Sequence, residues 1–195
     1  MSNRCKYLTS DKISLDKLNF KTFHCDDMSV TKSSEKTYSE CNKSDKDHPC
    51  FGYLQVYYIK NPMLYITTPK MKCLFGVQNR SNGNFQMSLQ FTNLDEDPLM
   101  KDFFNFIQGS EFRAMKRIGL TGEDADRFVS QIQYDKKEMY EPNLNVKIPF
   151  NYNQFQTDIY SEHSSGVNIF NIRIFQNMEC DLYVDRVWRM NDKFY

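Results

Sequence analysis

Hydrophobic and polar residues alternate most strictly between Phe85 and Phe91. Met87 and Leu89 would share one face of a strand with these two rings, while the polar residues between them would share the other face. This period of two is typical of a strand that is buried on one side. The preceding residues 81–84 (SNGN) predict a hairpin turn, since Asn-Gly tolerates positive φ angles.

Other runs rich in β-branched and aromatic residues flank this strand on both sides. They span Tyr53–Ile59, Met63–Thr68, Lys72–Gln78, Leu144–Phe150, Phe155–Tyr160, Val167–Gln176 and Cys180–Trp188. The loop Ser161–Gly166 would join two of them as a hairpin. Alternation in Leu144–Phe150 places Asn145 and Lys147 opposite Val146 and Ile148. In Val167–Gln176, it places Asn171, Arg173 and Phe175 opposite Phe170, Ile172 and Ile174.

The middle of the chain has helical spacing. The acidic residues and the proline of Asp95–Pro98 are typical of a helix start. Apolar residues then recur at helical intervals from Leu99 to Ile107, Gly109 interrupts them, and they resume as far as Ile118. Thr121 would begin another short helix with Phe128, Val129 and Ile132 as its apolar stripe. The order of strands, helices and strands predicts a mostly β, α+β fold.

Residues 1–50 differ in composition from the rest. The stretch Met28–Asp47 is rich in Ser, Lys and acidic residues, and it carries too little apolar surface to offset the entropy of ordering. We therefore predict a flexible polar leader over residues 1–50 and one domain over 51–195. Within the leader, Ile13, Leu15, Leu18 and Phe20 are spaced for a short docking strand or helix.

The N-terminus lacks the apolar stretch of a secretory signal, and no window approaches 18 consecutive apolar residues. We therefore expect an intracellular protein without membrane contact, in the cytosol or nucleus, with six free cysteines. The 25 basic and 25 acidic residues balance. This balance counts against nucleic-acid binding, although local patches matter more than the total.

No catalytic or metal-binding pattern is evident. The three histidines lie in leader or loop contexts, and the seven glycines never cluster into a phosphate-binding loop. His24, Cys25, Cys41, His48 and Cys50 lack the paired spacing of a structural zinc site. We therefore predict a protein that is not an enzyme and has neither a metal nor a cofactor.

Basic residues interleaved with aromatic residues give the remaining signal. Single-stranded nucleic acid is held by cations along its backbone and by rings that stack on its bases. The predicted phosphate contacts are Lys70, Lys72, Arg80, Lys147 and Arg173, and the predicted stacking rings are Tyr152, Phe175 and Tyr57. The cations of the helical region, among them Arg113, Lys116 and Arg117, are interpreted as a solvated helix face.

Three segments carry a resemblance to a known family. They are Met63–Gly76 (MLYITTPKMKCLFG), the acidic-start helix Asp95–Phe112, and Leu144–Ile148 (LNVKI) with the Ile-rich run and Trp188 that follow. In these segments, the chain resembles the single-stranded DNA-binding proteins of nucleocytoplasmic large DNA viruses, which are akin to those of short-tailed phages. The phage proteins end in an acidic tail, whereas this sequence ends in RMNDKFY.

The resemblance implies an OB-like, partly open β-barrel with a helical insertion after the third strand. It also implies a protein that binds single-stranded DNA in replication, recombination or repair of a viral or virus-like genome. Its partners would be single-stranded DNA and replication proteins, with RNA binding and a homodimer left open. The alternative is a β-sandwich that serves as a protein-interaction or virion structural domain.

Overall fold

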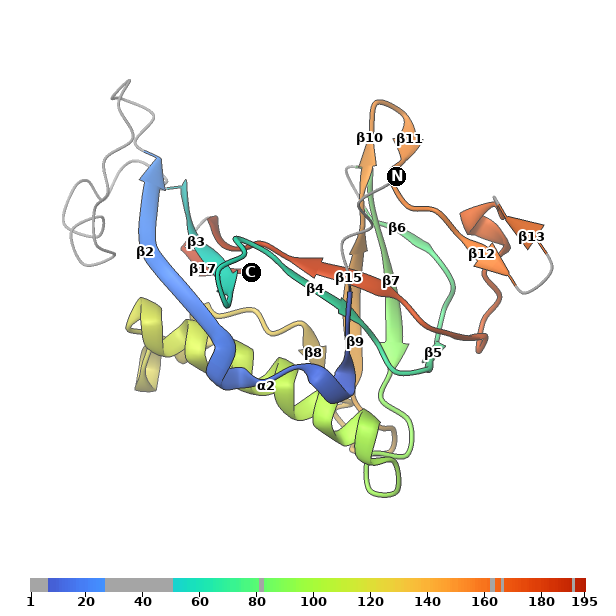
Figure 1. The fold of residues 1–195 in the computed structure, drawn as a ribbon, viewed down its shortest axis with the longest axis horizontal. Helices are drawn as coiled ribbons and strands as arrows, with labels where there is room; N and C mark the ends of the chain where they lie inside the picture. Colours follow the sequence, from blue (N-terminus) through green and yellow to red (C-terminus); the bar gives the residue numbers. More distant parts are fainter. Residues whose placement is uncertain (1–6, 27–50, 81–82, 162–163, 166, 191) are drawn as a thin grey trace. The chain divides into compact units, whose positions relative to one another are not determined.

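The computed structural model describes residues 7–26, 51–80, 83–161, 164–165, 167–190 and 192–195. In these residues the protein is mostly β, as the sequence predicts, with several sheets and one long α-helix (Figure 1). The predicted leader stretch Met28–Asp47 lies outside the described residues. The chain divides into two compact units: unit 1 takes in residues up to 67, 102–130 and 181–195, and unit 2 takes in 68–101 and 131–180.

A four-stranded sheet is the centre of unit 1. Its order is β17-β16-β3-β2, with the bounds Lys193–Phe194, Arg186–Met190, Phe51–Tyr58 and Leu18–Asp26. The predicted run Tyr53–Ile59 is therefore a strand, β3. Of the predicted docking segment of the leader, Leu15 lies in a 3-10 helix at Leu15–Lys17, whereas Leu18 and Phe20 begin the strand β2. This strand pairs antiparallel with β3 through a bulge between Phe20 and Phe23. Part of the predicted leader thus belongs to this sheet.

A second, three-stranded sheet of unit 1 has the order β1-β4-β15, with the bounds Leu8–Thr9, Leu64–Thr67 and Asp181–Val184. The predicted runs at Met63–Thr68 and Cys180–Trp188 both form strands. The second run is divided at Asp185 between β15 and β16. The Gln55 side chain holds the backbone at this point. Its amide donates to the carbonyl oxygen of Asp185 at 2.8 Å and to that of Pro62 at 2.6 Å.

The helix α2 spans Pro98–Ile118 and begins where the sequence predicts. The Asp97 carboxylate accepts from the backbone N–H of Leu99 at 2.9 Å, which satisfies one of the free donors of the first turn. The helix continues through Gly109, where we expected an interruption. A Cβ at Gly109 would lie 2.4 Å from Leu15 Cδ1, so this glycine provides space for a leucine side chain that packs against the helix.

Residues 102–118 of α2 supply part of the apolar core of unit 1. Ala114 and Ile118 of this helix lie in one buried cluster with Leu54 of β3 and Phe194 of β17. Phe128 packs against the cluster from the segment that follows the helix. That segment is a 3-10 helix at Gly122–Arg127, and Ile132 belongs to strand β8. A short helix does begin after Thr121 as predicted, but the predicted apolar stripe of Phe128, Val129 and Ile132 is wrong, because all three residues lie beyond the end of that helix.

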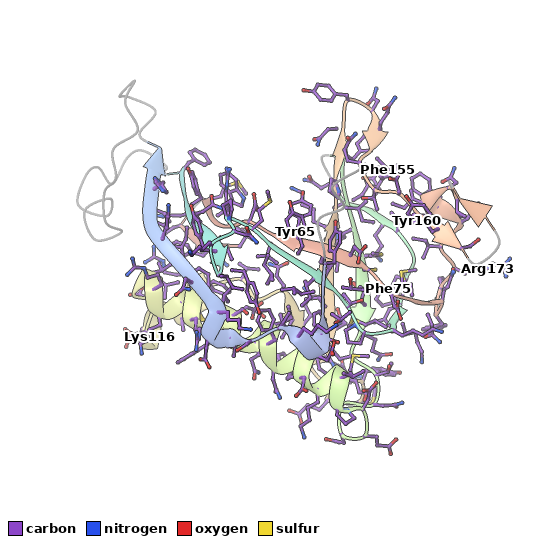
Figure 2. All side chains as sticks on the ribbon, in the orientation of Figure 1. Tyr65, Phe75, Lys116, Phe155, Tyr160 and Arg173 are labelled. Atoms are coloured by element: carbon purple, nitrogen blue, oxygen red, sulfur yellow. The ribbon has the colours of Figure 1, made fainter. Side chains whose placement is uncertain are left out.

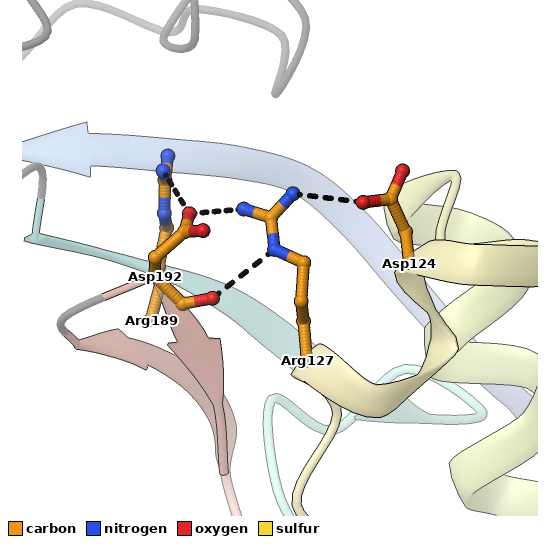
Figure 3. A network of polar contacts seen from close by, with 4 residues as sticks. All are labelled: Asp124, Arg127, Arg189 and Asp192. Carbon is orange, nitrogen blue, oxygen red and sulfur yellow. Dashed lines mark hydrogen bonds and ion pairs between the residues drawn. The ribbon is translucent and has the colours of Figure 1, made fainter.

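An ion-pair network links the 3-10 helix to the turn between β16 and β17 (Figure 3). Arg127 contacts the carboxylate of Asp192 through Nη2, donates to its backbone oxygen at 3.2 Å, and lies 3.4 Å from Asp124. Arg189 Nη2 donates to the same Asp192 carboxylate at 2.9 Å. The Arg189 side chain is only 8% exposed, so this carboxylate supplies a counter-charge to a guanidinium that is largely out of water.

Unit 2 is built on a six-stranded sheet with the order β14-β5-β7-β9-β8, and β6 pairs with β7. The bounds are Asn177–Met178, Met71–Cys73, Asn84–Gln90, Asn143–Ile148, Ile132–Gln133 and, for β6, Gln78–Arg80. The predicted alternation in β7 is confirmed: Phe85, Met87 and Leu89 are buried. The hairpin predicted at residues 81–84 is consistent with the β6–β7 pairing and with φ of +70° at Gly83.

The predicted strands at Phe155–Tyr160 and Val167–Gln176 are wrong. Among the described residues of this region, the strands are those of the short hairpins β10–β11 (Phe150–Asn151 with Gln154–Phe155) and β12–β13 (Tyr160–Ser161 with Ser164–Ser165). A 3-10 helix occupies Ile169–Asn171, and the Asn168 side chain caps it by accepting from the Phe170 N–H at 2.9 Å. Phe155 and Phe170 instead join Phe85 in an aromatic cluster, with ring centroids 4.7–6.1 Å apart.

Within the described residues, no helix has the length and apolarity needed to cross a bilayer.

Gly52 of β3 provides a test of how tightly unit 1 is packed. A Cβ there would lie 2.5 Å from Phe23 Cζ and 2.6 Å from the His24 carbonyl oxygen, so both a ring and a backbone would have to move. We expect Gly52→Ala to lower the free energy of unfolding by about 1–3 kcal/mol, as measured by urea denaturation. Gly83→Asn is the control, since a Cβ there meets no atom within 4 Å and Asn tolerates positive φ. Equal stability of the two variants would contradict this packing.

Candidate nucleic-acid interface

Three of the predicted phosphate contacts project from one face of the six-stranded sheet in unit 2. Residues directly opposed in neighbouring antiparallel strands share a face. The pairs are Lys72–Gln90, Arg80–Asn84 and Lys147–Gln86. Their partners are even-numbered residues of β7, and alternate residues of a strand share a face. The predicted placement of Lys147 opposite Val146 and Ile148 is therefore confirmed, and it extends to Lys72 and Arg80.

We call this surface the polar sheet face. Besides the three cations it carries Gln78, Asn84, Gln86, Ser88, Gln90, Gln133, Asn143, Asn145 and Asn177. None of the described strand residues of this sheet is acidic. The face therefore presents cations and amide donors without a competing carboxylate in the strands. Such a surface suits a polyanion, because phosphate oxygens accept from both kinds of donor.

Arg80 and Lys147 lie on either side of Gln86. With the Gln86 amide oxygen turned toward the guanidinium, Arg80 Nε and Nη2 donate to it at 3.0 and 2.7 Å. The register partner of Gln86 on its other side is Lys147. Both cations are exposed, and the hydrogen bonds to Gln86 hold the Arg80 side chain along the sheet. A guanidinium held in this way beside a second cation is a suitable contact for phosphate groups.

Two other predicted residues lie in turns of unit 2. Lys70 is exposed in the bend that leads into β5. Tyr152 is 98% exposed at the tip of the β10–β11 hairpin, where it and Asn153 have φ of +53° and +60°. Positive φ at both central residues is the geometry of a type I′ turn. The hairpin presents the Tyr152 ring to solvent, although nothing in the described contacts places it over the polar sheet face.

Arg173 and Phe175 do not share a strand face, contrary to the sequence prediction. They belong to the loop before the edge strand β14. The Phe175 N–H donates to the Cys73 carbonyl oxygen of β5 at 2.6 Å, and the Cys73 N–H donates to the Gln176 carbonyl oxygen at 2.8 Å. Phe175 has φ of +62° and is 64% exposed. The loop puts Phe175 beside β5, two strands away from Lys147 in β9, and Figure 2 labels Arg173 in the same part of unit 2.

Tyr57 lies in unit 1, on a surface that the sequence did not reveal. In β3, Tyr57, Gln55 and Tyr53 form the less buried face of the four-stranded sheet. Trp188 of β16 is the register partner of Tyr53 on one side, and His24 of β2 is its partner on the other. The His24 and Tyr53 rings are stacked with centroids 4.9 Å apart, and Tyr53 and Trp188 are 5.4 Å apart.

Tyr195 extends this row beyond β16. It exchanges two backbone hydrogen bonds with Trp188, at 3.0 and 2.9 Å, so the two side chains share a face. We call the surface formed by His24, Tyr53, Tyr57, Trp188 and Tyr195 the aromatic face. Its outer members are accessible, since Trp188 is 45% and Tyr195 43% exposed.

Cations lie directly on the aromatic face. The Arg186 guanidinium carbon is 4.6 Å from the centroid of the Tyr53 ring and 5.2 Å from that of Trp188. Lys21 Nζ is 4.6 Å from the Tyr57 centroid. Asp185 is the acidic neighbour, 3.5 Å from Arg186 Nε. Rings with a guanidinium among them combine base stacking with attraction for phosphate, as single-stranded nucleic acid requires.

Sequence reasoning missed Trp188 and Arg186 as binding residues for a definable reason. Alternation in Arg186–Met190 could have placed both on one face, because the apolar residue Val187 lies between them and is buried. What the sequence lacks is the pairing of β16 with β3, which lies about 130 residues earlier in the chain. Without that pairing, Trp188 and Tyr53 cannot be recognised as neighbours.

The titration of Cys73 agrees with a structural role. Burial on the apolar face of β5 raises the pKa of its thiol, which favours the neutral form. A neutral, buried thiol is a poor nucleophile. The described residues contain no group of three His, Cys, Asp or Glu side chains placed to hold a metal ion.

Comparisons with protein-family models, with curated proteins and with solved structures return no match for this chain.

Proposed function

We propose that this protein is a non-catalytic single-stranded DNA-binding protein that acts in replication, recombination or repair of a viral or virus-like genome. The observation that carries the proposal is the aromatic face of unit 1. There Tyr53 and Trp188 lie next to each other with the Arg186 guanidinium over both rings. Every base has a face that can stack on a ring, so this arrangement binds strands without requiring one sequence.

The polar sheet face of unit 2 supports the same function by a different contribution. Lys72, Arg80 and Lys147 supply charge for the backbone, and the amides beside them supply further donors. A chain with zero net charge can bind DNA in this way because its cations are concentrated on particular surfaces.

An OB-like barrel remains part of this proposal. OB-folds bind oligonucleotides on an exposed sheet face and adjoining loops, and both surfaces described above are sheet faces. In chain order, α2 follows β5, β6 and β7 of the six-stranded sheet and precedes its remaining strands. This order is compatible with a helix inserted between two halves of a β structure.

The alternative of a β-sandwich interaction or virion protein would use the same rings as a protein interface. Protein interfaces are depleted in charge at their centres. Arg186 and Lys21 lie on the rings of the aromatic face, and the strands of the polar sheet face hold no acid. The cations at these positions favour a polyanionic partner over an apolar one.

The test is a titration of labelled oligo(dT) at several salt concentrations. We expect the unsubstituted protein to bind at low ionic strength and to lose affinity as salt rises, with a log–log slope of about −0.7 per phosphate contact. Absent or salt-insensitive binding would refute the proposal.

Lys147→Gln tests the contribution of the polar sheet face. Removing one phosphate contact should reduce the magnitude of the salt slope by about 0.7 and weaken binding at low salt. Lys137→Gln is the matched control, since Lys137 is an exposed cation of a loop in unit 2 outside the sheet. Equal salt slopes for Lys147→Gln and Lys137→Gln would contradict phosphate binding by the polar sheet face.

A further inference from the structure

A groove of unit 1 concentrates positive charge beside the aromatic face. It runs between α2 and β2, which lie alongside each other in Figure 1. From α2 it is lined by Arg113, Lys116 and Arg117, and from β2 by Leu18, Asn19 and Phe20. Lys116 and Arg117 are exposed, and Figure 2 labels Lys116 on the helix. No sequence pattern marked this groove, because its walls are about 95 residues apart in the chain.

Arg113 is held in place at the groove. Its Nη1 donates to the Leu15 carbonyl oxygen at 2.5 Å, and its Nη2 pairs with the Asp16 carboxylate at 3.0 Å. A guanidinium has five N–H donors, so donors remain for an incoming anion. Asp16 is 91% exposed, and water screens its charge strongly. The groove therefore offers one oriented guanidinium and two accessible cations against one solvated carboxylate.

The groove adjoins the aromatic face across the edge strand β2. Asn19, which lines the groove, is the register partner of Tyr57, so its side chain and the Tyr57 ring share a face. Lys21, two residues further along β2, lies over the same ring. Neighbouring strands are about 4.8 Å apart, so β2 and β16 are separated by about 10 Å across β3. Asn19 pairs with Tyr57 and Trp188 with Tyr53, which adds about 13 Å along β3 at about 3.3 Å per residue. A strand of a few nucleotides can therefore reach from the groove to Trp188.

We propose that this groove binds the phosphate backbone of the single strand whose bases stack on the aromatic face. The inference rests on the proposed function and adds a phosphate site and a path to it. Cations in the last turn of a helix commonly complement the helix dipole. The interaction with the helix dipole explains why Lys116 and Arg117 lie in the last turn, but it does not explain why they line one groove with Asn19. A binding path for phosphate groups requires this shared groove.

The test uses the full chain and the double substitution Lys116→Gln/Arg117→Gln. Trp188 is the single tryptophan, so quenching of its fluorescence reports stacking on the aromatic face. We expect weaker oligo(dT) binding and a salt slope reduced in magnitude by up to about 1.4, which corresponds to two contacts of about 0.7 each. Quenching at saturation should be unchanged, because the rings remain. A thermal melt establishes that both proteins are folded.

Lys136→Gln/Lys137→Gln is the matched control, a pair of consecutive exposed cations in unit 2. An equal loss of oligo(dT) affinity in this control would overturn the proposed phosphate site, because the loss of any two positive charges would then explain both results. Wild-type affinity and slope in the groove variant, with the unsubstituted protein binding normally, would overturn the groove and leave the proposed function standing. No binding by the unsubstituted protein would overturn both. Poly-glutamate binding weakened to the same extent by the groove substitutions would assign the groove to acidic peptides instead.

Discussion

Replacing Trp188 by alanine is expected to weaken oligo(dT) binding by about 5- to 150-fold. A stacked base contributes about 1–3 kcal/mol, and about 1.4 kcal/mol corresponds to a factor of ten. Trp188 lies between Tyr53 and Tyr195 on the aromatic face, and its 45% exposed ring offers stacking area to a base beside the Arg186 guanidinium. Since the substitution removes the only tryptophan, binding is measured by the anisotropy of a labelled oligonucleotide.

Two variants show whether a loss at Trp188 is specific. Trp188→Phe keeps a ring at the same position and should retain most of the affinity. Tyr140→Ala removes a ring that is 67% exposed in unit 2, outside the strands of its sheet, and should bind as the unsubstituted protein does. Because Trp188 is 45% exposed, its replacement should leave the fold intact. Unchanged affinity in Trp188→Ala would remove the main support for the proposed function.

Replacing Phe194 by alanine is expected to lower the free energy of unfolding by about 3–5 kcal/mol. Its side chain is fully buried in the core of unit 1, with its ring centroid 6.1 Å from that of Phe23. The backbone around it is also held, since the Phe194 carbonyl oxygen accepts from the Val129 N–H at 2.7 Å. The cavity left by the missing ring cannot easily close around these fixed neighbours. Urea denaturation measures the loss.

Lys193→Ala is the control for Phe194→Ala, because Lys193 is the exposed neighbour in the same two-residue strand. Its replacement should change stability by no more than about 0.5 kcal/mol. A loss below about 1 kcal/mol in Phe194→Ala would mean that the core of unit 1 does not depend on this strand.

Local alternation explains which parts of the fold could be predicted. In β7, each apolar residue falls on the buried face, and the same rule placed Lys147 on the polar face of β9. The start of α2 was also predictable, because Asp97 and Pro98 act through contacts within the first turn. These features depend on residues close together in the chain.

Segments whose structure depends on an irregular backbone were not predictable. In β2, the bulge between Phe20 and Phe23 moves the buried positions from even to odd numbers, so no continuous alternation is visible in the sequence. Residues 167–176 alternate as a strand should, yet the Asn168 cap and the packing of Phe170 on Phe155 favour a 3-10 turn. Local pattern is a weak guide where side-chain caps compete with the strand.

In the candidate site, too, the residues in regular strands were predictable and the others were not. Lys72, Arg80 and Lys147 were found because each lies in or beside a regular strand. Arg173 and Phe175 were assigned to a strand that does not form. The pairing of β3 with β16, which brings Tyr53 and Trp188 together, is a long-range contact that no local pattern encodes.

The division of the chain between the two units has a consequence for synthesis on the ribosome. The chain changes unit after residues 67, 101, 130 and 180, and β16, the second of the two strands that pair with β3, comes only after the last of these changes. Unit 1 therefore cannot complete its four-stranded sheet until the segment 181–195 has emerged, long after β3 was made. Until then the edge of β3 and the apolar residues beneath it lack their final cover, which is a state in which nascent chains associate. Translation-coupled chaperone binding should accordingly persist until this last segment is available.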